Sequence, residues 1–88
     1  MIVWTDYLRY RAALRGFDLD DIESIVRYSD ERYMDTLTLR RVAIGRSQGQ
    51  LLMVPYDHEG ETWKPVTVHA TTRQQINTRL QSGRFRHE

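Results

Sequence analysis

The fold of this chain is decided by residues 39–57, which read LRRVAIGRSQGQLLMVPYD. Apolar and polar residues alternate in residues 39–46 with the period of a half-buried strand. Residues 47–50 form a polar, glycine-containing turn. Residues 51–57 are apolar enough for a central strand, although Pro55 has no amide donor and indicates a bulge or an edge. The stretch therefore predicts a β-hairpin.

Two further extended segments flank this hairpin. Residues 32–37 precede it, and residues 62–69 follow it after a turn at residues 58–61. Pro65 again indicates a bulge or an edge. Together these segments predict an antiparallel meander of three or four strands.

Two helices are expected before the strands. Asp6 is the expected N-cap of a helix that runs to about Arg15, where Gly16 can end it in a left-handed conformation. Asp18 is the expected cap of a second helix over residues 19–28. The apolar stripe expected on the first helix consists of Tyr7, Leu8, Ala12 and Leu14. The one expected on the second helix consists of Leu19, Ile22, Ile25 and Val26.

A third helix closes the chain. Thr71 or Thr72 can cap it, Ile76 and Leu80 give it a thin apolar seam, and it is expected to run to about Ser82. Strands that cluster between helices predict an α+β fold. We expect two N-terminal helices, an antiparallel sheet of three or four strands and a C-terminal helix. Helices on one face of the sheet would leave the other face partly open to a ligand.

Composition narrows the class of protein. Eighty-eight residues suit a single domain over residues 1–88. The absence of cysteine excludes disulfides, thiolate metal sites and thiol nucleophiles. No apolar run approaches the roughly 20 residues of a membrane span. The N-terminus lacks a basic region followed by an apolar stretch, so no signal peptide is visible. A cytoplasmic protein that does not bind membranes is expected.

Arginine dominates the charged residues. Lys64 is the only lysine among thirteen basic residues. Residues 18–31 hold six acids and one arginine, whereas residues 71–87 hold four arginines and no acid. A guanidinium binds phosphate or carboxylate with two parallel donors. This charge separation suits a polyanion on one side of the domain and a basic partner on the other.

The usual signatures of small-molecule enzymes are absent. His58, His69 and His87 lack the spacing of a metal site. The chain has no glycine-rich phosphate loop, nucleophile elbow or zinc-binding helix motif. We therefore expect neither a metal nor another cofactor.

The open face of the sheet is the expected place of a polar site. Strand alternation puts Leu52, Val54, Tyr56 and His58 on one side of their strand, and Trp63, Pro65, Thr67 and His69 on one side of the next. If Tyr56 and His69 meet Arg11 and Arg46 there, the site holds a phenol, an imidazole and guanidinium groups. RNA cleavage by a 2′-hydroxyl needs a base, an acid and a cation, and Trp63 could stack an unpaired base. The alternative is that these aromatic residues only pack and that the histidine is merely exposed.

Three segments resemble a known family. Residues 7–17 (YLRYRAALRGF), residues 41–46 (RVAIGR) and residues 65–73 (PVTVHATTR) are similar to the BrnT toxins of the wider RelE-like group. Tyr7 stands where those relatives have histidine or lysine, and His69 where BrnT proteins have arginine. The resemblance spans nearly the whole chain.

The resemblance implies a RelE-like fold, metal-independent endoribonuclease activity against messenger RNA, and a cognate antitoxin that masks the active surface. The expected catalytic residues are His69, Tyr56 and Arg11. The expected RNA-binding residues are Arg15, Arg46, Arg73, Trp63 and Arg79. The departures at Tyr7 and His69 leave open a fold that persists while cleavage is altered or lost. The alternative is a non-catalytic module that binds protein or RNA.

Overall fold

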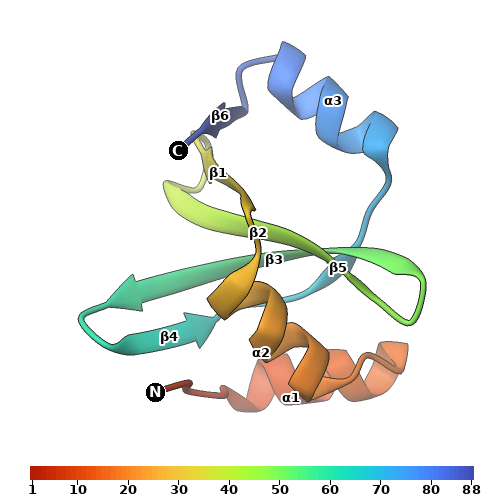
Figure 1. The fold of residues 1–88 in the computed structure, drawn as a ribbon, viewed down its shortest axis with the longest axis vertical. Coiled ribbons are helices and arrows are strands. Elements are labelled where there is room, and N and C mark those ends of the chain that lie inside the picture. The colour runs from red at the N-terminus through yellow and green to blue at the C-terminus, as the bar shows by residue number, and fades with distance from the viewer.

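An antiparallel sheet forms the middle of the molecule, with helices on both of its sides (Figure 1). The computed structural model describes residues 1–88. The helices are α1 (Asp6–Arg15), α2 (Leu19–Tyr28) and α3 (Arg73–Gln81). The strands are β1 (Glu31–Asp35), β2 (Arg40–Ser47), β3 (Gln50–Glu59), β4 (Thr62–Pro65), β5 (His69–Ala70) and β6 (Phe85–His87). The predicted α+β class is confirmed.

The hairpin of β2 and β3 is the centre of the sheet, as predicted. The strand order is β4-β3-β2-β1-β6, and β5 pairs with β3 beyond the end of β4. Ser47 pairs with Gln50, and the two residues between them, Gln48 and Gly49, have φ values of 53° and 80°. Two consecutive positive φ values are the signature of a type I′ turn, whose twist matches that of the flanking strands.

The segment expected as one strand, residues 62–69, forms two strands with a bulge between them. Tyr56 pairs with Pro65, and Met53 pairs with His69. Two residues of β3, Val54 and Pro55, therefore lie opposite three residues, 66–68, of the neighbouring segment. Pro55 lies opposite the bulge, where its carbonyl accepts from Val66 N at 2.8 Å. A residue in an antiparallel strand directs its N–H and C=O to the same neighbouring strand. Pro55 therefore lacks an amide donor at a position where the hydrogen bonds between β3 and the next strand are already interrupted by the bulge.

Two short strands enlarge the sheet beyond the three or four expected. They are β5 and β6, of two and three residues. β6 pairs antiparallel with β1, and Phe85 of β6 stacks on Tyr33 of β1 with ring centroids 5.4 Å apart. No hydrophobic period is visible in so short a segment, so the sequence could not reveal it.

One core lies between the sheet and the two N-terminal helices. Its buried members are Leu8, Ala12, Ile22, Ile25, Val26, Ala43, Leu52, Val54, Tyr56 and Val68. Two of the four residues of the apolar stripe expected on α1, Leu8 and Ala12, are buried as predicted. The prediction is wrong for Tyr7 and Leu14, which are exposed. The expected cap is also corrected. Thr5, not Asp6, accepts the hydrogen bond from Leu8 N, at 3.0 Å.

α2 packs closely against β2. Asp18 caps it as predicted and accepts from Asp20 N at 2.7 Å. A Cβ atom added to Gly45 of β2 would lie 2.6 Å from Cγ1 of Ile25. Glycine at this position therefore allows the helix to approach the sheet.

A second core lies on the other face of the sheet, under α3. It contains Tyr33, Val42, Ile44, Leu51, Met53, Ile76 and Phe85. The expectation that all helices cover one face is therefore wrong, because Ile76 of α3 is buried against the opposite face. Thr72 caps α3 and accepts from Gln75 N at 3.1 Å. None of the three helices is long and apolar enough to cross a membrane.

Candidate functional site

His69 lies at the edge of the sheet, in β5. Its antiparallel partner is Met53, whose side chain belongs to the core under α3. Val68, one residue earlier, is buried in the other core, against α1 and α2. The side chains of Val68 and of the half-buried His69 therefore lie on opposite faces of the sheet.

Arg11 of α1 binds this edge. Its Nε donates to the carbonyl of Val68 at 3.3 Å, and its Nη2 lies 3.0 Å from Nδ1 of His69. A guanidinium group is always protonated and only donates, so Nδ1 must be the acceptor. The proton of a neutral imidazole then sits on Nε2, which remains a free donor.

The surroundings of His69 favour its neutral form. Burial lowers the pKa of His69, and the charges of Arg11, Arg79 and Arg15 lower it further. Desolvation and nearby cations both penalise a second positive charge. His69 is therefore neutral at neutral pH.

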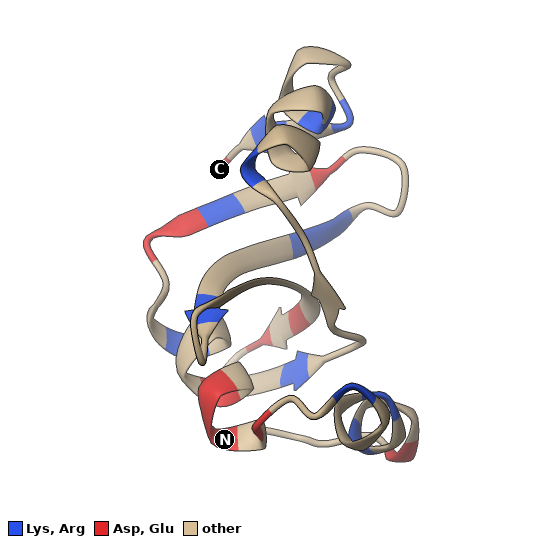
Figure 2. Ribbon diagram, turned by 90° about the vertical axis from the view of Figure 1, so that its right-hand side faces the viewer, with Lys and Arg blue, Asp and Glu red and all other residues tan.

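Arginines of two helices converge on this histidine. Arg15 follows Arg11 by one turn of α1, and the two side chains line a hollow of about 210 Å³ with His69. Arg79 of α3 lines a second hollow, of about 350 Å³, which also reaches His69. Arg79 is held there by Met53, whose Sδ accepts from Nη1 at 3.0 Å. Figure 2 shows basic positions on both α1 and α3, with the sheet between them.

These three arginines have no carboxylate partner. The five ion pairs of the structure are Arg27–Glu23, Arg40–Asp57, Arg41–Glu88, Arg73–Glu31 and Arg84–Asp35. Arg11, Arg15 and Arg79 are in none of them. We call these three arginines and His69 the His69 cluster. It is an uncompensated concentration of positive charge around a neutral imidazole, which is the arrangement that binds an anion.

Tyr56 and Trp63 are not part of the His69 cluster. The predicted side of β3 is confirmed, but that side faces α1 and α2, and Tyr56 is only 2% exposed there. Its hydroxyl accepts from Nη1 of Arg32 at 2.9 Å. Trp63 stacks on His58, with centroids 3.5 Å apart, and packs against the same core. Both aromatic residues pack, which is the alternative that the sequence left open.

Arg46 and Arg73 also lie apart from the His69 cluster. Arg46 is exposed near the turn between β2 and β3, where its Nη1 donates to the carbonyl of Gly49 at 3.3 Å. Arg73 donates to Oε2 of Glu31 at 2.6 Å. Hydrogen bonding to Arg73 lowers the pKa of Glu31. The expected convergence of Arg46 and Tyr56 with Arg11 and His69 is therefore wrong.

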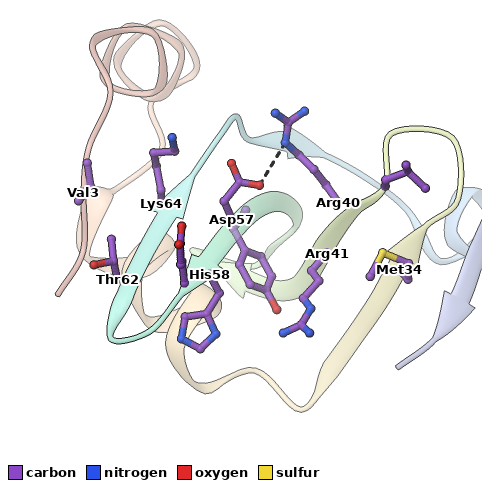
Figure 3. A pocket seen from close by; sticks show the side chains of 11 residues that line it. Val3, Met34, Arg40, Arg41, Asp57, His58, Thr62 and Lys64 are labelled. Atoms are coloured by element: carbon purple, nitrogen blue, oxygen red, sulfur yellow. Dashed lines mark ion pairs between the residues drawn. The ribbon is translucent and has the colours of Figure 1, made fainter.

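The largest hollow, of about 940 Å³, lies beside the last residues of β3 and the strand β4, and shares Arg40 with the hollow under α3 (Figure 3). Its two arginines are already neutralised. Arg40 pairs with Asp57 at 3.4 Å, as the dashed line in Figure 3 marks, and Arg41 pairs with Glu88 at 3.2 Å. Arg40 and the Arg84–Asp35 pair also line the hollow under α3. The hollows around His69 are nevertheless the better anion sites, because Arg11, Arg15 and Arg79 have no carboxylate partner.

Two polar residues near His69 were missed in the sequence. Thr71 and Gln75 line the same hollow as Arg79, and the hydroxyl of Thr71 donates to Oε1 of Gln75 at 3.1 Å. The signal that could have revealed them is their separation by four residues across the start of α3, where side chains become neighbours.

Comparison with known proteins gives no match: no family model, no curated sequence and no solved structure is significantly similar to this chain.

Proposed function

We propose that this chain is a cytoplasmic, toxin-like RNA-binding domain that holds phosphate groups in the His69 cluster. The observation that carries the proposal is the meeting of Arg11, Arg15 and Arg79 at one imidazole without a carboxylate partner. Guanidinium groups bind phosphate oxygens with paired, charge-assisted hydrogen bonds. The resemblance to BrnT proteins supports RNA as the polyanion.

Each member of the cluster has a separate task in this proposal. Arg15 and Arg79 supply the charge, from opposite sides of His69. Arg11 holds His69 in position and keeps Nε2 protonated, so that the imidazole adds a neutral donor. A neutral donor among cations binds a phosphate oxygen without adding to their mutual repulsion.

The second candidate is metal-independent endoribonuclease activity, and the lowered pKa of His69 favours it. A neutral imidazole is the form that accepts a proton. A phosphate bound by Arg11 would release Nδ1, which then takes the proton of the 2′-hydroxyl. The 2′-oxygen bonds to phosphorus, the bond to the 5′-oxygen breaks, and that oxygen takes a proton from water. The hydroxide that remains takes the proton of the His69 imidazolium, which restores the neutral imidazole. Tyr56 has no part in this step, because it is buried in the α1–α2 core.

The resemblance also supports a protein partner of the antitoxin type. We propose that such a partner covers the His69 cluster with acidic side chains, since uncompensated guanidinium groups attract carboxylates. The adaptor alternative keeps this partner and omits RNA. RNA titrations therefore separate the two.

Fluorescence anisotropy with a labelled oligoribonucleotide tests RNA binding. The logarithm of affinity is expected to fall linearly with the logarithm of salt concentration, with a slope near −0.7 for each phosphate contacted. Arg15→Ala and Arg79→Ala should each reduce the slope by about one phosphate contact. Arg11→Ala should weaken binding because it releases His69 from its position. Arg9→Ala is the matched control, because Arg9 is an exposed arginine of α1 without an ion pair. A wild-type protein that does not bind RNA at low salt overturns the proposal.

Incubation of RNA in chelator tests cleavage separately. The expected products carry a 2′,3′-cyclic phosphate and a 5′-hydroxyl, and His69→Ala should abolish them while RNA binding persists. Equal products from wild type and His69→Ala, or none from either, would leave RNA binding and remove the nuclease.

A further inference from the structure

The outer face of α1 carries an apolar stripe that nothing in the structure covers. Tyr7, Tyr10 and Leu14 are 56%, 63% and 61% exposed. Neither tyrosine hydroxyl makes a hydrogen bond, and neither ring stacks on another ring. Large apolar side chains are usually exposed singly, and a contiguous group of them marks a binding surface.

The stripe lies directly beside the His69 cluster. Successive residues of a helix are rotated by about 100°. Tyr10 and Leu14 therefore lie within about 60° of Tyr7 on one side. Arg11 and Arg15 lie about 40° and 80° from Tyr7 on the other side, between the stripe and the buried face. α1 thus presents aromatic rings and guanidinium groups as two parallel rows.

The charges beside the stripe indicate which kind of ligand binds there. The only carboxylate of α1 is Asp6, at the N-terminal turn and on the flank away from the arginines. The other flank carries Arg11 and Arg15, with His69 and Arg79 beyond them. A polymer that lies here needs phosphates on one side and flat apolar groups on the other.

We infer that the ligand is single-stranded RNA, whose unpaired bases stack on Tyr7 and Tyr10 while its phosphates lie in the His69 cluster. This inference rests on the proposed function. The stripe is about 10 Å long, at a rise of about 1.5 Å per residue. That length accommodates on the order of three nucleotides stacked about 3.4 Å apart.

Single-stranded RNA can contact the row of aromatic rings with its bases and the row of guanidinium groups with its phosphates, and duplex RNA cannot. In a duplex the flat faces of the bases are stacked on one another, and only the phosphates, the 2′-hydroxyls and the base edges are accessible. Rings that stack on bases discriminate little between sequences, because every base has a flat face. The stripe therefore predicts a preference for unpaired RNA with weak sequence preference.

Three probes of one length test the inference by anisotropy: a single-stranded RNA, its duplex, and a single strand with abasic sites. The single strand should bind most tightly. Tyr7→Ala and Tyr10→Ala should each weaken its binding on the order of tenfold, the loss of one stacked base. Their salt slopes should stay unchanged, because no phosphate contact is lost.

Two controls separate stacking from other effects. Tyr10→Phe keeps the ring and should bind as wild type does. Tyr28→Ala removes a tyrosine that is 75% exposed on α2, away from the cluster, and should also bind as wild type does. 2-Aminopurine placed in the RNA should be quenched by wild type and not by the Tyr7→Ala, Tyr10→Ala double variant.

The outcomes distinguish this inference from the function on which it rests. Equal affinity for all three probes, with salt slopes that still respond to Arg15→Ala, overturns the stacking surface and leaves phosphate binding intact. Unchanged affinity in both tyrosine variants overturns it as well, and leaves the stripe to a protein partner. No binding of any probe at low salt overturns both.

Discussion

Nη2 of Arg11 lies 3.0 Å from Nδ1 of His69, although the two residues are 58 positions apart in the chain. The contact joins α1 to β5 across the edge of the sheet. It assigns the imidazole proton to Nε2, because the guanidinium can only donate. The charge state of the candidate site therefore depends on one hydrogen bond.

The first prediction concerns the titration of His69. Burial and the charges of Arg11, Arg79 and Arg15 lower its pKa below the usual 6.5. Arg11→Ala should raise the pKa toward that value, since one cation is removed and burial remains. The measurement is a pH titration of the imidazole C–H signals by NMR, with assignment by His69→Gln.

The same shift has a consequence for stability. The unfolded chain takes up this proton at a higher pH than the folded chain does, so stability falls as the pH decreases below about 6.5. His69→Gln should show a smaller loss between pH 7 and pH 5. A titration at or above 6.5, or one insensitive to Arg11→Ala, would contradict the contact.

The second prediction concerns the buried carboxylate of Asp35. Burial raises the pKa of Asp35, but two hydrogen bonds from Arg84 and one each from the amides of Leu37 and Thr38 outweigh it, so the pKa is lowered. Arg84→Ala leaves the carboxylate without its cation and should cost about 1–3 kcal/mol of unfolding free energy. Arg40→Ala breaks an exposed pair with Asp57 and should cost no more than about 1 kcal/mol.

The dependence of the unfolding free energy on acid pH tests the role of the same carboxylate. A lowered pKa means that its stabilising effect is present above the ordinary value of 3.8 and is lost as the pH falls through the folded pKa. Urea unfolding at pH 7 and at pH 3 should show a larger loss for wild type than for Asp35→Asn. Equal losses would contradict the role of the charge.

The third prediction concerns the contact of α2 with β2. Gly45→Ala places a Cβ atom where Cγ1 of Ile25 would be 2.6 Å away, and should cost about 1–3 kcal/mol through overpacking. In an Ile25→Ala background the same change should cost much less, because the clashing atoms are gone. Urea unfolding of the four proteins gives the coupling energy. Additive costs would show that α2 does not rest on Gly45.

The fourth prediction concerns Tyr33. Burial, together with a hydrogen bond to Glu31, raises its pKa to about 12. An ultraviolet titration should show one tyrosine that ionises near this pH, and Tyr33→Phe should remove it. The raised pKa means that stability is fully present below pH 10 and decreases as the pH rises toward 12. A last tyrosine transition unaffected by Tyr33→Phe would refute the assignment.

The regular elements could be predicted because their signals are local. The one-sided stripe and the cap at Asp18 mark α2, and the polar turn at Gln48 and Gly49 marks the hairpin. Each depends on residues within one helix or one strand pair. The face covered by α3 has no local signal, because Ile76 and Leu80 would suit either side of the sheet.

The candidate site was predicted only in part, for a similar reason. Alternation along residues 62–69 puts His69 on the same side as Trp63 if the strand is continuous. The extra residue in the bulge reverses this, so that Trp63 packs toward α1 and α2 while His69 pairs with Met53 on the α3 side. A shift of one residue exchanges the two faces of a strand.

By itself the sequence determined the α+β order, the central hairpin and the supply of arginines, since hydrophobic period and composition need no knowledge of distant residues. Only the tertiary structure decided which arginines meet. The bulge opposite Pro55 sets the side of His69, and the packing of two helices on opposite faces brings Arg11 and Arg79 to it while Arg73 is neutralised by Glu31. Charges separated by tens of residues become neighbours only through the packing of the whole chain.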